Sequence, residues 1–118
     1  MINGYKDLIV WQKSMDLVDE IYKIVRLLPP EERFALSDQM RRSAVSIPSN
    51  IAEGYERKSK KEYVHFLSVA KSSRAELETQ IHICIRQKFI TAESADKAFG
   101  LCSEVGKILN ALISKENT

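Results

Sequence analysis

Cysteine is scarce in this chain, since Cys84 and Cys102 are the only two among 118 residues. Two cysteines are too few for the disulfide framework of a small secreted domain. Both occupy apolar periodic positions, where cysteine behaves as a small hydrophobic residue. Residues 1–6 also lack the basic segment and apolar run of a secretory signal peptide. We therefore expect two core thiols, no disulfide between them, and a reducing, cytoplasmic location.

Long apolar runs and strand patterns are also missing. No apolar run approaches the roughly 18–20 residues that span a bilayer, so we expect no membrane partner. No segment alternates apolar and polar residues between turn dipeptides, as a half-buried strand would. At 118 residues the chain has the length of one ordinary domain. We predict a single all-α domain over residues 1–118, with a flexible N-terminus at 1–6 and a frayed C-terminus at 114–118.

Catalytic and metal-binding patterns are absent as well. A di-iron bundle needs a Glu-x-x-His pair on each of two helices and a further Glu on two others. Glu62 and His65 supply one such pair, but Thr79 stands three residues before His82, the only other histidine. Helical RNA-cleaving domains of the HEPN type separate an arginine from a histidine by four to six residues, whereas the candidate pairs here are separated by seven. With no zinc-ligand spacing, Cys/His pair or Gly-rich phosphate loop, we expect no metal, no cofactor and no enzymatic activity.

What the chain does have is helical periodicity. The first helix, over about residues 7–28, carries two apolar rows. The expected bundle seam is Leu8, Trp11, Met15, Val18, Tyr22 and Val25, and the row beside it is Leu17, Ile21, Ile24 and Leu28. Two rows form a face wider than one neighbouring helix covers. We therefore expect part of this helix to be buried against a second copy in a homo-oligomer.

The second helix contains a proline. We expect it to begin at Pro30, because proline is tolerated at the first helical position, and to end at Gly54, because glycine is common at helix C-termini. Pro48 lies inside it and removes a backbone donor at a cost of roughly 3 kcal/mol. We predict a kink at Pro48, with Ser46 or Asn50 bonding the carbonyls that the kink frees.

Two further helices complete the pattern. Ser59 and Glu62 form a capping box at the start of the third helix. Ala70 and Ser73 are small and allow a neighbouring helix to approach closely, while Gln80 lies near the core and needs a hydrogen-bond partner. The fourth helix is expected to begin at Thr91 after a very short turn. Because short connections make neighbouring helices antiparallel, the predicted fold is an up-down-up-down four-helix bundle.

Three segments carry a family resemblance. They are DLIVWQK at residues 7–13, LPPEERFALSDQMRRSAVSIPSNIAEG at 28–54 and EYVHFLSVAKSSRAELETQ at 62–80. Together they resemble the family called four helix bundle protein, or 23S rRNA-intervening sequence protein. The resemblance implies a left-handed antiparallel four-helix bundle that assembles into a ring, with five subunits the form associated with the family. Relatives include the accessory protein of diversity-generating retroelements, described as a basic barrel that binds nucleic acid and a reverse transcriptase.

The chain departs from this family pattern at two places. Ala35 stands where a glycine is usual, and Lys71, Ser72 and Ser73 stand where Arg-Gly-Ser is usual. The first change reduces backbone freedom before the second helix, and the second keeps a base and a small residue. We expect the fold to be intact, and only a function that depends on the close approach of that glycine would be affected.

Charge is distributed unevenly along the chain. Although the net charge is only +2, residues 39–74 contain eight basic and three acidic residues, an excess of five positive charges, so the remainder carries an excess of three negative charges. Such asymmetry favours an anionic partner. The candidate phosphate-binding residues are Arg41, Arg42, Arg57, Lys58, Lys60 and Lys61. Each of these residues could equally be a surface residue that only increases solubility. Arg41 or Arg42 could instead form an ion pair with Glu53 or Glu78.

Two functions remain open from the sequence. The first is an oligomeric module that binds RNA or DNA by electrostatic contact with phosphates. The second is a scaffolding subunit that binds another protein. Asn50 and Glu53 are candidates for contacts either with the third helix or with a neighbouring subunit. Salt discriminates between the two functions, because only nucleic-acid binding weakens steeply as salt is raised.

Overall fold

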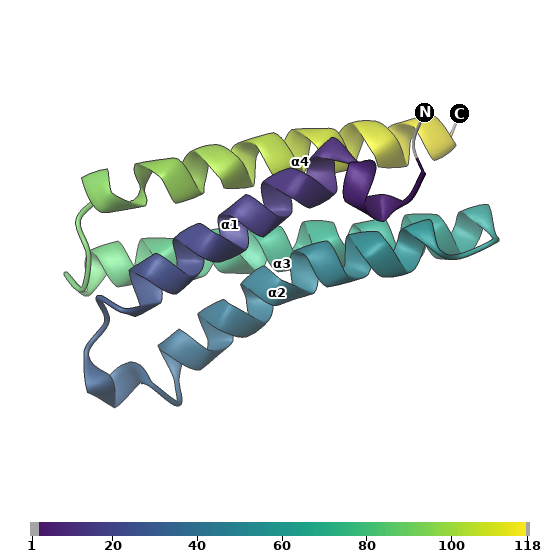
Figure 1. Ribbon diagram of the computed structural model, residues 1–118. Coiled ribbons are helices and arrows are strands. Elements are labelled where there is room, and N and C mark those ends of the chain that lie inside the picture. Colours follow the sequence, from purple (N-terminus) through teal and green to yellow (C-terminus); the bar gives the residue numbers. More distant parts are fainter. Residues whose placement is uncertain (1–2, 118) are drawn as a thin grey trace.

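The protein is an all-α four-helix bundle. The computed structural model describes residues 3–117, in which there is no strand. Short 3-10 turns precede three of the helices, and the elements are η1 (Tyr5–Asp7), α1 (Ile9–Val25), η2 (Pro30–Glu32), α2 (Leu36–Tyr55), α3 (Lys60–Arg86), η3 (Glu93–Ala95) and α4 (Asp96–Glu116). Figure 1 shows the α1–α2 and α3–α4 connections at one end of the molecule and the α2–α3 connection at the other, so the chain reverses direction after each helix.

Each helix packs mainly on two others. α1 contacts α2 and α4, α3 contacts the same two helices, and the α2–α3 contact is the most extensive. The predicted seam of α1 is wrong, because the row that points into the core is Val10, Ser14, Leu17, Ile21 and Ile24. Ser14 makes this row hard to recognise in the sequence because it is polar. Its hydroxyl can be buried because it donates a hydrogen bond to the carbonyl of Trp11 at 2.8 Å. The row expected to be the seam lies at the edge of the bundle instead.

The connection between α1 and α2 is longer than expected. α1 ends at Val25, and Pro30 begins only a single 3-10 turn rather than α2. Ala35 leaves the helical region, with φ −120° and ψ −104°, so α2 begins at Leu36. Likewise, Thr91 precedes a 3-10 turn, and α4 begins at Asp96.

The expected mobility of the two ends stays a prediction. Residues 5–7 form a 3-10 turn, and α4 remains helical through Glu116. Residues 1, 2 and 118, which fall within the two expected flexible ends, lie outside the described part of the chain.

α2 continues through Pro48, which is buried inside it. The amide nitrogen of Asn50 donates to the carbonyl of Ser46 at 2.8 Å and to its hydroxyl at 2.9 Å. That hydroxyl also lies 2.8 Å from the hydroxyl of Ser73 on α3. Polar side chains therefore bond the backbone beside the proline and connect it to the neighbouring helix. The carbonyl that the proline deprives of its N–H donor is that of Ala44, four residues earlier, so the predicted compensation of a freed carbonyl stays a prediction. The kink at Pro48 itself stays a prediction.

Gly54 does not have the role that its position suggests. α2 continues past it to Tyr55, and no glycine in the described chain has a positive φ. A β-carbon at Gly54 would lie 3.0 Å from Cβ of Phe66 and 3.3 Å from the carbonyl oxygen of Tyr63. The glycine is therefore needed because α3 approaches α2 closely, not because a helix ends there.

The start of α3 follows the expected capping box, since the hydroxyl of Ser59 accepts a hydrogen bond from the backbone N–H of Glu62 at 3.0 Å. Ala70 is fully buried, and a second polar contact to α2 joins Ser43 to the carboxylate of Glu76 at 2.8 Å. Gln80 is buried as predicted, but its Oε1 has no hydrogen-bond partner among the described residues.

The two thiols are free and buried. Cys84 lies in the core with its sulfur 3.4 Å from that of Met40. Burial raises the pKa of Cys84 to about 11 and that of Cys102 to about 12. Within residues 3–117, no cluster of three histidine, cysteine or acidic side chains could hold a metal ion. None of the helices described is both long and apolar enough to cross a membrane.

Candidate nucleic-acid interface

The α2–α3 connection gathers four of the six predicted basic residues at one end of the bundle. We call Arg57, Lys58, Lys60 and Lys61 the basic turn. Arg57 is held in place on three sides: it pairs with Glu53 at 2.9 Å and with Glu62 at 3.7 Å, and its guanidinium lies 4.8 Å from the ring centre of Phe66. Glu53 therefore contacts the turn rather than the body of α3. Arg57 acts as the anchored member of the group, with part of its charge already neutralised.

The three lysines of the basic turn are in a different situation. Lys58, Lys60 and Lys61 are all exposed. Their side chains make no hydrogen bond or ion pair within residues 3–117. The turn as a whole, from residue 56 to 62, has four basic side chains against two acidic ones, Glu56 and Glu62. The lysine ammonium groups are thus free to contact an anionic partner.

A shallow hollow adjoins the basic turn. It has a volume of about 390 Å³ and is lined by Tyr55, Arg57, Lys58, Ser59, Lys60, Tyr63 and Glu116. Two tyrosines beside lysines are the combination that single-stranded nucleic acid favours, because bases stack on aromatic rings while the backbone follows the positive charge. Burial, together with the nearby Glu116 and Tyr55, raises the pKa of Tyr63, so its ring stays neutral. Glu116 is the one acidic side chain in the lining and opposes an anion there.

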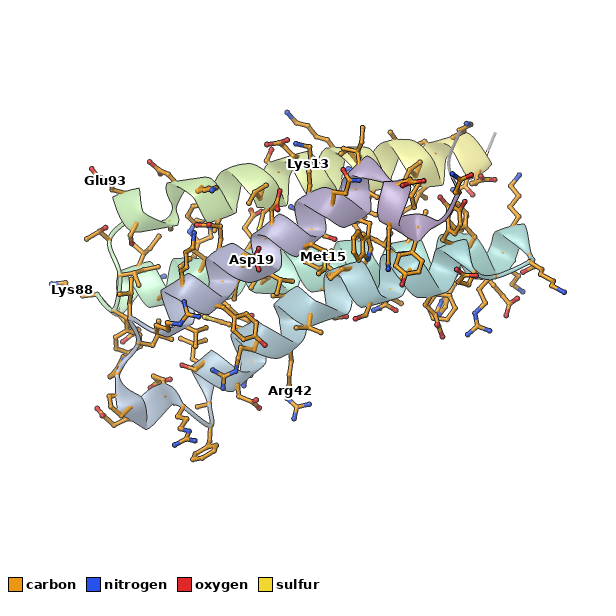
Figure 2. All side chains as sticks on the ribbon, viewed as in Figure 1. Lys13, Met15, Asp19, Arg42, Lys88 and Glu93 are labelled. Atoms are coloured by element: carbon orange, nitrogen blue, oxygen red, sulfur yellow. The ribbon has the colours of Figure 1, made fainter. Side chains whose placement is uncertain are left out.

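Arg41 and Arg42 lie elsewhere. They sit near the start of α2, about 20 Å along the helix axis from Tyr55 and the basic turn. Arg42 pairs with Asp38 at 3.0 Å, and Figure 2 shows its side chain projecting away from the bundle. Arg41 donates to the carbonyl of Arg33 at 3.4 Å. The structure therefore places the six predicted residues in two groups rather than one.

The suggested ion pairs of Arg41 or Arg42 with Glu53 or Glu78 are not formed. Glu53 pairs with Arg57, and Glu78 pairs with Arg74 at 3.0 Å. Both pairs join residues four apart on the chain, where consecutive helical turns bring side chains together. The sequence contained this signal, because Asp38 likewise precedes Arg42 by four residues.

A second surface of interest runs between α1 and α2. Along it, the outer row of α1 is only partly covered: Met15 and Tyr22 are 40% and 38% exposed. A hollow of about 310 Å³, which we call the α1–α2 groove, is lined by Tyr5, Trp11, Met15, Val18, Val45, Pro48, Ser49 and Ala52. Figure 2 shows Met15 and Asp19 on the α1 side of this surface. The apolar excess expected for the first helix is thus present, on the side that faces α2.

One exposed aromatic residue has no counterpart in the sequence-based predictions. Phe34 is 86% exposed, and the guanidinium of Arg33 lies 5.1 Å from its ring centre. Leu27, in the same connection, is 58% exposed. Phe34 lies between helices and belongs to neither periodic row, so periodicity gave no sign of it. Its nearest signal in the sequence was its place in the segment 28–54, which carries the family resemblance.

Comparison with known proteins agrees with this architecture. The sequence pattern described as 23S rRNA-intervening sequence protein matches residues 6–111. The fold is similar to the crystal structure of a protein of unknown function from the S23 ribosomal protein family of Bacteroides thetaiotaomicron, with a TM-score of 0.82 and 28% identity over 89% of this chain and 98% of that one. A search of curated proteins found no match. From the pattern that covers most of its length, the chain belongs to the 23S rRNA-intervening sequence protein family.

Proposed function

We propose that the protein is a non-enzymatic, self-associating module that binds single-stranded nucleic acid through the basic turn. The observation that carries the proposal is the set of three exposed lysines, Lys58, Lys60 and Lys61, that have no anionic partner within residues 3–117. Lysine at an exposed site contacts phosphates as a point charge and carries no sequence information. Binding would therefore be tolerant of sequence and sensitive to salt. The two free, protonated thiols suit a reducing cytoplasm.

Single strands are favoured over duplexes by the hollow beside the turn. Tyr55 and Tyr63 both line it, and Tyr63 is half-buried, which holds its ring in place. Stacking of a base on an aromatic side chain contributes about 1–3 kcal/mol and does not depend strongly on which base is present. A duplex keeps its bases stacked on each other and would use only the lysines.

Self-association supports the proposal because one basic turn offers few phosphate contacts. The α1–α2 groove leaves apolar side chains uncovered in a single copy, which is typical of an interface. A second copy of the chain is the occupant that we propose, in a closed ring with five subunits as the form that the family resemblance implies. Repeating the turn around a ring raises the effective concentration of lysines along one strand.

The test is binding of a labelled, mixed-sequence single-stranded RNA and of its duplex across a salt series. If about six phosphates are engaged, log affinity should fall against log salt with a slope of about −4 for the single strand and about −5 for the duplex. Replacing Lys58, Lys60 and Lys61 by glutamine should flatten the single-strand slope by about 2 for each subunit that contacts the strand, because each lost contact removes about 0.7. Tyr55→Ala should weaken binding of the single strand but not of the duplex.

A matched control removes the same number of charges elsewhere. Lys88, Lys97 and Lys107 are exposed and lie outside the basic turn. Their replacement by glutamine should leave the slope within about half a unit of wild type, because long-range effects of surface charge are screened within about 10 Å at moderate salt. Equal losses in both triple variants would show that only net charge matters. If the wild-type protein retains no RNA or DNA at low salt, the alternative role as a protein-binding scaffold replaces this proposal.

A further inference from the structure

The most exposed large apolar side chain in the described structure is at the tip of the α1–α2 connection. Phe34 is 86% exposed and Leu27 is 58% exposed. Both belong to the α1–α2 connection, which Figure 1 shows at the opposite end of the bundle from the α2–α3 connection. A phenylalanine this open to water is costly to keep, because burying it would stabilise the protein by about 1.5–3 kcal/mol. No neighbouring helix of the same chain covers it. The exposed ring of Phe34 is therefore suited to an intermolecular contact.

The same chain carries a hollow that would accept such a ring. The α1–α2 groove has a volume of about 310 Å³ and is lined mostly by apolar atoms from residues such as Trp11, Met15 and Val45. Within a single copy the tip cannot reach this groove, because Phe34 precedes α2 whereas Pro48, on the groove floor, lies about 20 Å along the helix axis. The ring and the hollow can meet only between two molecules.

Charge agrees with this pairing. Arg33 stands directly against the ring of Phe34, 5.1 Å from its centre, and would travel with it into a partner. One exposed carboxylate, Asp19, lies on α1 next to Val18 of the groove lining, as Figure 2 shows. An arginine placed beside the groove would contact this acidic side chain, which favours one orientation of the docked residue.

We infer that Phe34 of one copy docks into the α1–α2 groove of the next, with Arg33 placed against Asp19. This inference rests on the self-association proposed above and specifies how it takes place. Because the tip and the groove are different parts of the surface, the contact is head-to-tail, and each copy uses its tip on one neighbour and its groove on the other. Contacts of this kind form a ring when the rotation closes. Because rotation alone relates the copies of a closed ring, the offset of about 20 Å between Phe34 and the groove requires the bundles to be inclined to the ring axis.

A head-to-tail contact can be tested with two complementary variants. Phe34→Ala removes the tip but keeps the groove, and Val45→Lys blocks the groove but keeps the tip. Val45 is 42% exposed, so lysine can be accommodated on the monomer surface while its charge repels Arg33. Each variant alone should be monomeric by light scattering. A mixture of the two at high micromolar concentration should form a 1:1 dimer and nothing larger, because one intact contact remains and neither free end can extend it.

The matched control is Ile83→Lys on α3. Ile83 is 40% exposed, nearly as much as Val45, and it lies outside the groove. This variant should keep the wild-type mass. Far-UV circular dichroism of all three variants should show unchanged helix content and cooperative melting, because none of the replaced side chains is buried.

The outcomes separate this inference from the proposal on which it rests. A monomeric wild-type protein would overturn both. An oligomeric wild-type protein whose Phe34→Ala variant has the same mass would overturn only the docking of Phe34, and self-association would stand. Two monomeric variants that fail to pair on mixing would also overturn it. The docking of Phe34 would likewise be overturned if the Phe34→Ala variant stayed oligomeric but no longer bound single-stranded RNA. That result would make Phe34 a residue on which bases stack.

Discussion

Single residues in this bundle show why composition alone misleads about glycine. Gly54 and Gly100 both lie inside helices, yet a β-carbon at Gly54 would lie 3.0 Å from that of Phe66, whereas one at Gly100 would meet nothing within 4 Å. At Gly54 the neighbouring atoms belong to a backbone carbonyl and a Cβ, neither of which can move without shifting α3. The two glycines therefore have opposite consequences when replaced.

We predict that Gly54→Ala destabilises the protein and that Gly100→Ala stabilises it. Overpacking of this kind typically costs about 1–3 kcal/mol, more than alanine gains in helix propensity near a helix end. At Gly100 only the propensity gain of about 0.5–1 kcal/mol remains. Urea unfolding at equal protein concentration measures both. An increase in stability for Gly54→Ala would mean that α3 can move away from α2 at no cost.

At the scale of the element, the C-terminus of α3 departs from the usual residue choice. Lys88 has φ 65°, the one non-glycine residue with positive φ in the described chain. The backbone N–H of Lys88 donates to the carbonyl of Ile85, and that of Phe89 donates to the carbonyl of Cys84, both at 3.0 Å. These two bonds form a Schellman motif, in which glycine normally occupies the position of Lys88.

Lys88→Gly should therefore stabilise the protein by about 1 kcal/mol, because a side chain in the left-handed region costs about 1–2 kcal/mol and glycine has no such cost. Lys88→Ala is the control, since it removes the charge but keeps the β-carbon, and it should change the midpoint of thermal unfolding very little. If the alanine and glycine variants were equally stabilised, the gain would come from removing the lysine charge and not from the backbone.

The helices differ in how well the sequence predicted them. The existence of four helices and the capping box at Ser59 follow from local patterns, and the structure contains them. The sequence shows Leu17, Ile21 and Ile24 as an apolar row of α1 but does not identify it as the core row, because Ser14 is polar and interrupts its continuation to Val10. The beginning of α2 was placed at Pro30 because proline and two glutamates suit any helical start, and only the backbone of Ala35 shows that this one stops after a turn.

For the whole molecule, the sequence predicted the amount of charge but not its grouping. The excess of basic residues in 39–74 is real, yet Arg41 and Arg42 belong to a different part of the surface from the basic turn. Arg57 and Arg74 are committed to Glu53 and Glu78. Which cations remain free depends on pairing between turns of a helix and on the fold of the connection, and neither is visible in a count of charges.

Self-association should make stability depend on concentration. If the α1–α2 groove is covered only in the oligomer, mass action favours the folded state as protein concentration rises. We predict that the midpoint of thermal unfolding increases over a hundredfold range of concentration for the wild type and stays constant for Phe34→Ala. Scanning calorimetry at three concentrations measures this. A wild-type midpoint that does not move would indicate that subunit contact adds nothing to folding.

The buried thiols have a practical consequence for spectroscopy. Cys84 and Cys102 are inaccessible, and at neutral pH they are almost entirely protonated because burial raises the pKa of each to about 11 or 12. The natural cysteines should therefore not react with maleimide dyes. A cysteine introduced at the exposed position Glu93 would be the one reactive thiol. Glu93 lies at the opposite end of a 43 Å bundle from the basic turn, as Figure 2 shows. A dye there would report energy transfer between subunits of the proposed oligomer without contacting the proposed RNA surface.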